Sequence, residues 1–93
     1  MNRIELIFAK ADISLAGFPY GKEVYEEQVK EKIDISDITE IVFPERIEYI
    51  ASSFVQGFFS EIINMVGYKV VEKNIIIVTG FEELTESVYE NLY

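Results

Sequence analysis

The chain has 93 residues, of which 17 are acidic and 8 are basic, so its net charge at pH 7 is −9. Hydrophobic residues make up 49% of it, which is enough for one core and too much for an intrinsically disordered chain. The absence of Cys and His excludes thiol chemistry and histidine-based metal sites or general bases. The shortage of Lys and Arg argues against direct binding of nucleic acid.

The first half of the chain predicts two strands, a helix and a further strand. Residues 3–10 alternate between apolar and polar positions, which indicates a strand, and residues 11–16 are expected to be its hairpin partner. Residues 17–21 contain two glycines and a proline, so we expect them to interrupt regular secondary structure. A helix is expected to follow at residues 22–33. A turn at residues 34–37 then leads to a β-rich run at residues 39–43, which Pro44 ends.

The second half predicts two helices separated by a strand. A linking stretch at residues 45–51 precedes Ser52 and Ser53, which are typical helix N-caps. The helix is expected to run over residues 53–66 and to end at Gly67. Residues 74–79 contain an unbroken β-branched run, which is typical of a strand covered on both faces, and a last helix is expected at residues 81–92.

These elements predict one domain over residues 1–93, with the order β(β)αβαβα. Strands that alternate with helices indicate a small α/β fold with a largely parallel sheet. No segment resembles an export signal or a membrane span, so we expect a cytoplasmic protein with no membrane partner. Phosphate-binding glycine motifs and metal-ligand spacings are missing, so we expect no enzyme activity, no cofactor and no metal.

The predicted helix at residues 53–66 carries an unusually wide apolar arc. At about 100° per residue the apolar side chains cover about 180°, whereas a surface helix needs only about 100°. The surplus indicates either deep burial or a flank that contacts a partner. Gln56, Ser60 and Asn64 form an uncharged strip on the opposite side, which favours contact with a protein partner or a second copy of the chain.

The acidic residues concentrate in the second part of the chain. The last predicted helix contains four glutamates and no basic residue. Of these, Glu83, Glu86 and Glu90 are the candidates for a surface that docks on a basic protein. The other interpretation is a solvated face that only keeps the protein soluble.

The segment Ile47-Glu48-Tyr49-Ile50-Ala51-Ser52-Ser53-Phe54-Val55-Gln56-Gly57-Phe58-Phe59, followed by Gly67-Tyr68, resembles the STAS-like family of small bacterial and phage proteins. These proteins are similar to the STAS domains of anti-sigma-factor antagonists. The resemblance covers residues 17–93 and implies a regulatory interaction module whose partner binds the face of this helix. It also implies phosphorylation at Ser53, with Ser52 beside it, by a partner that is a kinase-like ATPase. Ala51 stands where the antagonists carry Asp, and Phe54 where they carry Gly.

We therefore expect a small acidic protein-interaction module that acts as a regulator through the helix beginning at Ser53. The alternative is a phage-encoded anti-defence inhibitor, whose acidic surface blocks the basic nucleic-acid site of a host effector. A third hypothesis is a sensor of a small ligand or nucleotide at the sheet end near Gly80, although a glycine there is more typical of a simple turn.

Overall fold

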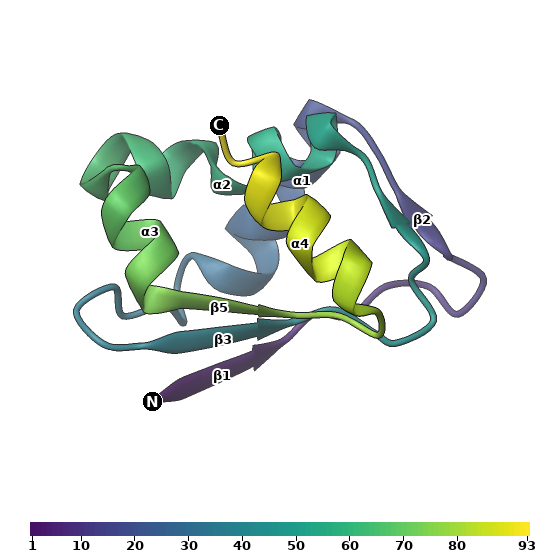
Figure 1. Cartoon of the computed structure of the whole chain (residues 1–93), viewed down its shortest axis with the longest axis horizontal. Helices are drawn as coiled ribbons and strands as arrows, with labels where there is room; N and C mark the ends of the chain where they lie inside the picture. The colour runs from purple at the N-terminus through teal and green to yellow at the C-terminus, as the bar shows by residue number, and fades with distance from the viewer.

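Three parallel strands form the main sheet, in the order β1–β3–β5 (Figure 1). They are β1 at Asn2–Glu5, β3 at Thr39–Val42 and β5 at Ile75–Val78. The register aligns Ile4, Ile41 and Ile77 across the sheet, and all three side chains are buried. Parallel neighbours need a crossover connection, and helices supply both crossovers. The computed structural model describes all 93 residues and confirms the small α/β class.

The helices lie on one face of this sheet (Figure 1). They are α1 at Phe18–Val24, the π-helix η1 at Tyr25–Val29, α2 at Ser52–Val66, α3 at Tyr68–Asn74 and α4 at Glu82–Glu90. None of them has the length and the apolar character that a bilayer-crossing helix requires. Gly67 ends α2 with a positive φ of 85°, as predicted, but the helix α3 that follows it was not predicted.

The predicted hairpin at residues 11–16 is wrong. The second strand is the short β2 at Ser14–Leu15, and it pairs in parallel with β4 at Tyr49–Ile50 rather than with β1. β4 lies in the stretch that was expected only to link two elements. The partner of β1 is β3, whose register with β1 is set by the buried apolar residues of both strands. The β2–β4 pair therefore aligns the two segments that lead into α1 and α2.

The first helix begins earlier than predicted and ends earlier. It starts at Phe18, because a proline within the first helical turn costs no hydrogen bond, so Pro19 opens the helix rather than preventing it. Gly21 and Gly57 have a packing role at the crossing of α1 and α2. A Cβ atom on Gly57 would overlap the carbonyl oxygen of Phe18, and one on Gly21 would overlap the carbonyl oxygen of Phe54. The two helices thus pack backbone against backbone.

The expectation that residues 74–79 are covered on both faces is wrong. Ile75 and Ile77 are buried, but Ile76, which points to the opposite face, is 38% exposed. The helices cover a single face of the sheet, so the apolar run of β5 alternates between the core and the open face. A run of β-branched residues carries no period-2 signal, which is why the sequence could not distinguish the two arrangements.

The core explains most of the wide apolar arc of α2. Phe54, Val55, Phe58, Phe59 and Ile62 are all buried. The aromatic rings among them form a continuous cluster with Phe43, which directly follows β3, and the centroids of Phe43 and Phe58 lie 6.1 Å apart. Met65, which is 69% exposed, is the large apolar side chain of this helix that remains in solvent.

Candidate functional site

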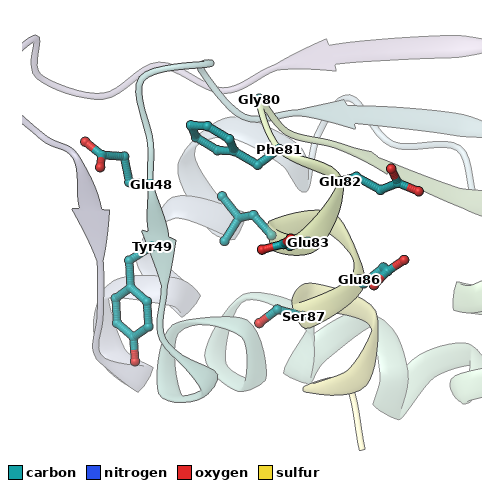
Figure 2. Close-up of a pocket in the computed structure, with 9 residues that line it drawn as sticks. Glu48, Tyr49, Gly80, Phe81, Glu82, Glu83, Glu86 and Ser87 are labelled. Atoms are coloured by element: carbon teal, nitrogen blue, oxygen red, sulfur yellow. The ribbon is translucent and has the colours of Figure 1, made fainter.

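A groove of about 780 Å³ lies between β4 and α4 (Figure 2). We call it the acidic groove. It is lined by Glu48, Tyr49, Gly80, Phe81, Glu82, Glu83, Leu84, Glu86 and Ser87. One wall is formed by Glu48 and Tyr49 at the start of β4, and the other by the turn at Gly80 and the first two turns of α4. The strand end, the tight turn and the helix that follow one another at residues 75–90 therefore build most of the site.

Two exposed aromatic residues line the acidic groove, and Figure 2 shows the Tyr49 ring directed away from α4. Tyr49 is 60% exposed and Phe81 is 49% exposed. Figure 2 shows the ring of Phe81 extending from the start of α4 toward β4. The turn before Phe81 depends on Gly80, because a Cβ atom there would lie 2.6 Å from the carbonyl oxygen of Glu45. This close approach gives Gly80 a structural role in the turn.

The glutamates of the acidic groove have no cationic partner in the chain. None of Glu48, Glu82, Glu83 and Glu86 forms an ion pair, whereas Glu5, Glu40 and Glu61 do. The basic side chain closest to Glu48 in sequence is Arg46, and its guanidinium is used elsewhere. It donates hydrogen bonds to the carbonyl oxygens of Phe8 and Ala9, at 2.8 Å and 2.7 Å. The negative charge of the groove is thus available to an external cation.

The side chains of α4 divide between two directions. Glu83 and Ser87 project from the side nearer β4, and Glu82 and Glu86 project from the opposite side of the helix (Figure 2). Glu82 and Glu83 lie in the first turn of α4, where the positive end of the helix dipole stabilises carboxylates. No group of acidic residues in the chain is arranged to hold a metal ion. Carboxylates in this arrangement attract cationic groups and repel anionic ones such as phosphates.

The three glutamates predicted as a docking surface do not form one cluster. Glu83 and Glu86 line the acidic groove. Glu90 lies one helical turn beyond Glu86 and instead borders a second hollow with Glu72, Tyr89 and Tyr93. The acidic face of α4 therefore continues past the groove toward α3.

The uncharged strip of α2 borders a different hollow, of about 320 Å³. Gln56, Ser60 and Asn64 line it together with Ile63, Tyr68, Leu92 and Tyr93. The rings of Tyr68 and Tyr93 stack at its edge, with centroids 4.9 Å apart. Gln56 and Asn64 are exposed, while the Ser60 hydroxyl donates a hydrogen bond to the carbonyl oxygen of Gly57 at 2.9 Å. The strip and the acidic groove share no residue.

The N-cap predicted from Ser52 and Ser53 does not form. The capping position is Ala51, and no side chain caps α2. The helix instead begins one residue earlier than expected, and Ser53 lies within its first turn. The Ser53 hydroxyl accepts a hydrogen bond from the backbone N–H of Gly17 at 3.0 Å, which ties the segment before α1 to the start of α2. Ser52 is exposed and Ser53 is half-buried.

Sequence reasoning missed the aromatic part of the site. The sequence predicts Tyr49 in a linking stretch and Phe81 only at the start of a helix. The available signal was the position of Phe81, an aromatic residue between Gly80 and two glutamates. A comparison with protein families, with curated proteins and with solved structures found no match.

Proposed function

We propose that this protein is an acidic interaction module that binds a basic protein surface through the acidic groove. The observation that carries the proposal is the combination of two exposed aromatic residues, Tyr49 and Phe81, with nearby glutamates that have no internal ion pair. Of these glutamates, Glu83 lies on the side of α4 nearer β4, and Glu82 and Glu86 lie on its outer side (Figure 2). Aromatic side chains dominate the energy of protein interfaces, and charges around them direct association. A solubility device alone needs the carboxylates but not the exposed rings.

The net charge supports the same partner class. At −9 the chain attracts cationic surfaces over a distance of about one Debye length, roughly 8–10 Å in physiological salt. Carboxylates at the rim of a contact mainly accelerate association, while rings at its centre slow dissociation. We therefore assign Phe81 and Tyr49 to the lifetime of the complex, and Glu83 and Glu86 to its formation.

A regulatory role follows from the resemblance to STAS-like proteins. β4 forms one wall of the acidic groove and continues into α2, so a partner on the groove lies close in sequence to Ser52 and Ser53. In this proposal a kinase-like ATPase modifies one of these serines, and phosphorylation changes the affinity for the partner. A phosphate at the first turn of α2 is favoured by the free N–H groups of that turn. The strip at Gln56, Ser60 and Asn64 is the second contact surface in this proposal.

The experiment is affinity capture from the cells that express the protein, with quantification of the bound proteins. The wild type is compared with a variant that combines Phe81→Ala, Glu83→Gln and Glu86→Gln. A control carries Glu26→Gln and Glu27→Gln, which removes two charges from the exposed side of η1. We expect a basic protein to bind the wild type and the control, to be lost from the groove variant, and to be released by salt. Equal capture by all three proteins would contradict the proposal.

The inhibitor remains as a second candidate function, which the unpaired glutamates of the groove favour. If the basic partner surface is a nucleic-acid site, DNA or RNA and this protein cannot occupy it together. Adding nucleic acid to the purified complex should then displace the protein in proportion to its concentration. Formation of a ternary complex would exclude the inhibitor and leave the regulatory module.

A further inference from the structure

A further pocket, of about 220 Å³, lies between the η1 segment and the C-terminal half of α2. We call it the Tyr25 pocket. It is lined by Tyr25, Lys30, Ile33, Ile35, Glu61, Ile62, Met65 and Val66. Six of these eight residues are hydrophobic, and none of them lines the acidic groove. A concave, mostly apolar site with few polar groups is the usual form of a small-molecule pocket.

The π-helix η1 gathers the polar groups of the Tyr25 pocket on one side. The backbone N–H of Lys30 donates a hydrogen bond to the carbonyl oxygen of Tyr25 at 2.9 Å, which is the five-residue turn of a π-helix. In an α-helix, residues five apart point about 140° away from each other. A π-turn brings residues five apart closer to the same side, and Tyr25 and Lys30 both line the pocket. Such turns occur often at functional sites.

The hydroxyl of Tyr25 has no hydrogen-bond partner within the chain, although the residue is only 4% exposed. Its ring is held edge-on against Phe58, with the centroids 5.9 Å apart. Burial, and secondarily the charge of Glu61, raises the pKa of Tyr25. The hydroxyl itself reaches solvent at the pocket, so it is a donor that no other group of the chain uses. An incoming acceptor would take the place of a water molecule there.

The charges at the rim restrict the ligand. Lys30 Nζ lies 3.3 Å from Glu61 Oε1, so each charge is already compensated. A charged ligand would have to break this ion pair, whereas a neutral ligand leaves it intact. The volume is about seven times the roughly 30 Å³ that one water molecule occupies in the liquid. This space suits a molecule with a single ring.

We propose that the Tyr25 pocket binds a small neutral molecule with a ring-sized apolar body and one oxygen that accepts a hydrogen bond from Tyr25. This inference goes beyond the proposed function, because it concerns a different part of the molecule. Phenol is the simplest probe of this class. Toluene has the same ring without the oxygen, and benzoate has a similar ring with a negative charge.

The test is a titration of the ¹⁵N-labelled protein with each probe, followed by NMR. We expect phenol to shift the backbone amides of residues 25–35 and 61–66 with saturation, and to bind more tightly than toluene or benzoate. Tyr25→Phe should weaken phenol binding about two- to tenfold, the effect of one hydrogen bond, and leave toluene binding unchanged. The control Tyr20→Phe, at a residue that does not line the pocket, should bind phenol like the wild type.

Three results would overturn the proposal. The first is the absence of saturable shifts at these amides, and the second is equal phenol affinity in the wild type and Tyr25→Phe. The third is tighter binding of N-acetyl-tyrosinamide than of phenol. That result would mean that the pocket binds a tyrosine side chain of a partner protein rather than a free small molecule. Val66→Phe, which fills the pocket from the end of α2, should abolish phenol binding while the thermal unfolding transition remains cooperative.

Discussion

The hydroxyl of Tyr89 occupies the free edge of β5 at Ile77. It accepts a hydrogen bond from the Ile77 N–H at 2.9 Å and donates one to the carbonyl oxygen of Ile75 at 3.2 Å. β5 is an edge strand, because β3 is its one neighbour in the sheet. Both of these backbone groups point away from β3, so a side chain of α4 takes the place that a fourth strand would take. An exposed apolar edge is a template for association with another chain, and this contact blocks it.

Tyr89→Phe should therefore destabilise the protein and open the edge. We expect the free energy of unfolding to fall by about 1–2 kcal/mol, because two hydrogen bonds are lost. The Ile77 amide should exchange with solvent faster than its neighbours, and the protein should self-associate at high concentration. Urea denaturation, amide exchange by NMR and light scattering measure these effects. Tyr93→Phe, at an exposed tyrosine, is the control. Unchanged protection of Ile77 would contradict this role for Tyr89.

On the other side of the sheet, Gln28 binds the backbone of Ile7 in the segment that follows β1. Its side-chain amide accepts a hydrogen bond from the Ile7 N–H at 2.8 Å and donates one to the Ile7 carbonyl oxygen at 2.9 Å. Gln28→Glu keeps the shape but places a carboxylate against that carbonyl, so we expect a loss of about 1 kcal/mol at pH 7. Gln56→Glu, at an exposed position of α2, is the matched control.

The pH provides an internal check on Gln28→Glu. A protonated carboxyl group can again donate to the Ile7 carbonyl oxygen and accept from the Ile7 N–H. The difference in stability between the Gln28→Glu and Gln56→Glu variants should therefore shrink as the pH falls below about 4. A difference that is the same at pH 7 and at low pH would mean that the hydrogen bonds to Ile7 are not its cause.

The crossing of α1 and α2 should not tolerate a side chain at Gly57. Its Cβ atom would overlap the backbone of Phe18, and a backbone cannot rotate out of the way as a side chain can. We expect Gly57→Ala to lower the free energy of unfolding by about 3 kcal/mol, although alanine is the better helix former. Ser60→Ala, one turn along α2, should change it by less than about 1 kcal/mol. A fully stable Gly57→Ala protein would exclude this close packing.

Ser53 should contribute to stability through Gly17 rather than as a helix cap. Ser53→Ala leaves the half-buried N–H of Gly17 without an acceptor, so we expect a loss of about 1 kcal/mol. Ser53→Asp retains an acceptor and adds a charge that suits the first turn of α2, so it should remain close to the wild type. Ser52→Ala should have no effect. Chemical denaturation of the three variants tests this order.

The binding of the partner to these variants tests the phosphorylation hypothesis separately. Ser53→Asp imitates the charge of a phosphate, so it should alter the affinity for the captured partner, whereas Ser53→Ala should prevent modification. If both variants bind the partner as the wild type does, Ser53 has only the structural role.

The acidic helix α4 should be stabilised by removing charge from its end and destabilised by removing it from its start. Glu86 and Glu90 are one turn apart and repel each other, and Glu90 lies at the negative end of the helix dipole. Glu90→Gln should therefore raise the free energy of unfolding by about 0.5 kcal/mol. Glu82→Gln, in the first turn, should lower it by a few tenths of a kcal/mol. Thermal unfolding in low and high salt measures both effects, which should fade in high salt. Two changes of the same sign would contradict the argument.

The sequence by itself determined the α/β class, the positions of β3, β5, α2 and α4, and the end of α2 at Gly67. These elements have strong local signals: apolar periodicity, β-branched runs and glycine at a position with positive φ. The sequence also predicts an acidic surface on α4, because glutamates without basic neighbours are expected to lie in solvent in a small domain. Glu83 and Glu86 could for this reason be identified as surface candidates before their surroundings were known.

Only the tertiary structure decided how these elements pair and what their polar atoms contact. β2 is two residues long, which is too short to show an alternation of apolar and polar residues. Its pairing with β4 rather than β1 therefore depends on how the helices pack. In the sequence, a serine that caps a helix cannot be distinguished from one that bonds a distant backbone group. The proximity of Gly17, 36 residues away, gives Ser53 the second role. The contacts of Tyr89 and Gln28 are to backbone atoms distant in the chain, and Tyr25 lies in a π-turn. Such contacts leave no local pattern, because the free energy that selects them comes from burial of the assembled core.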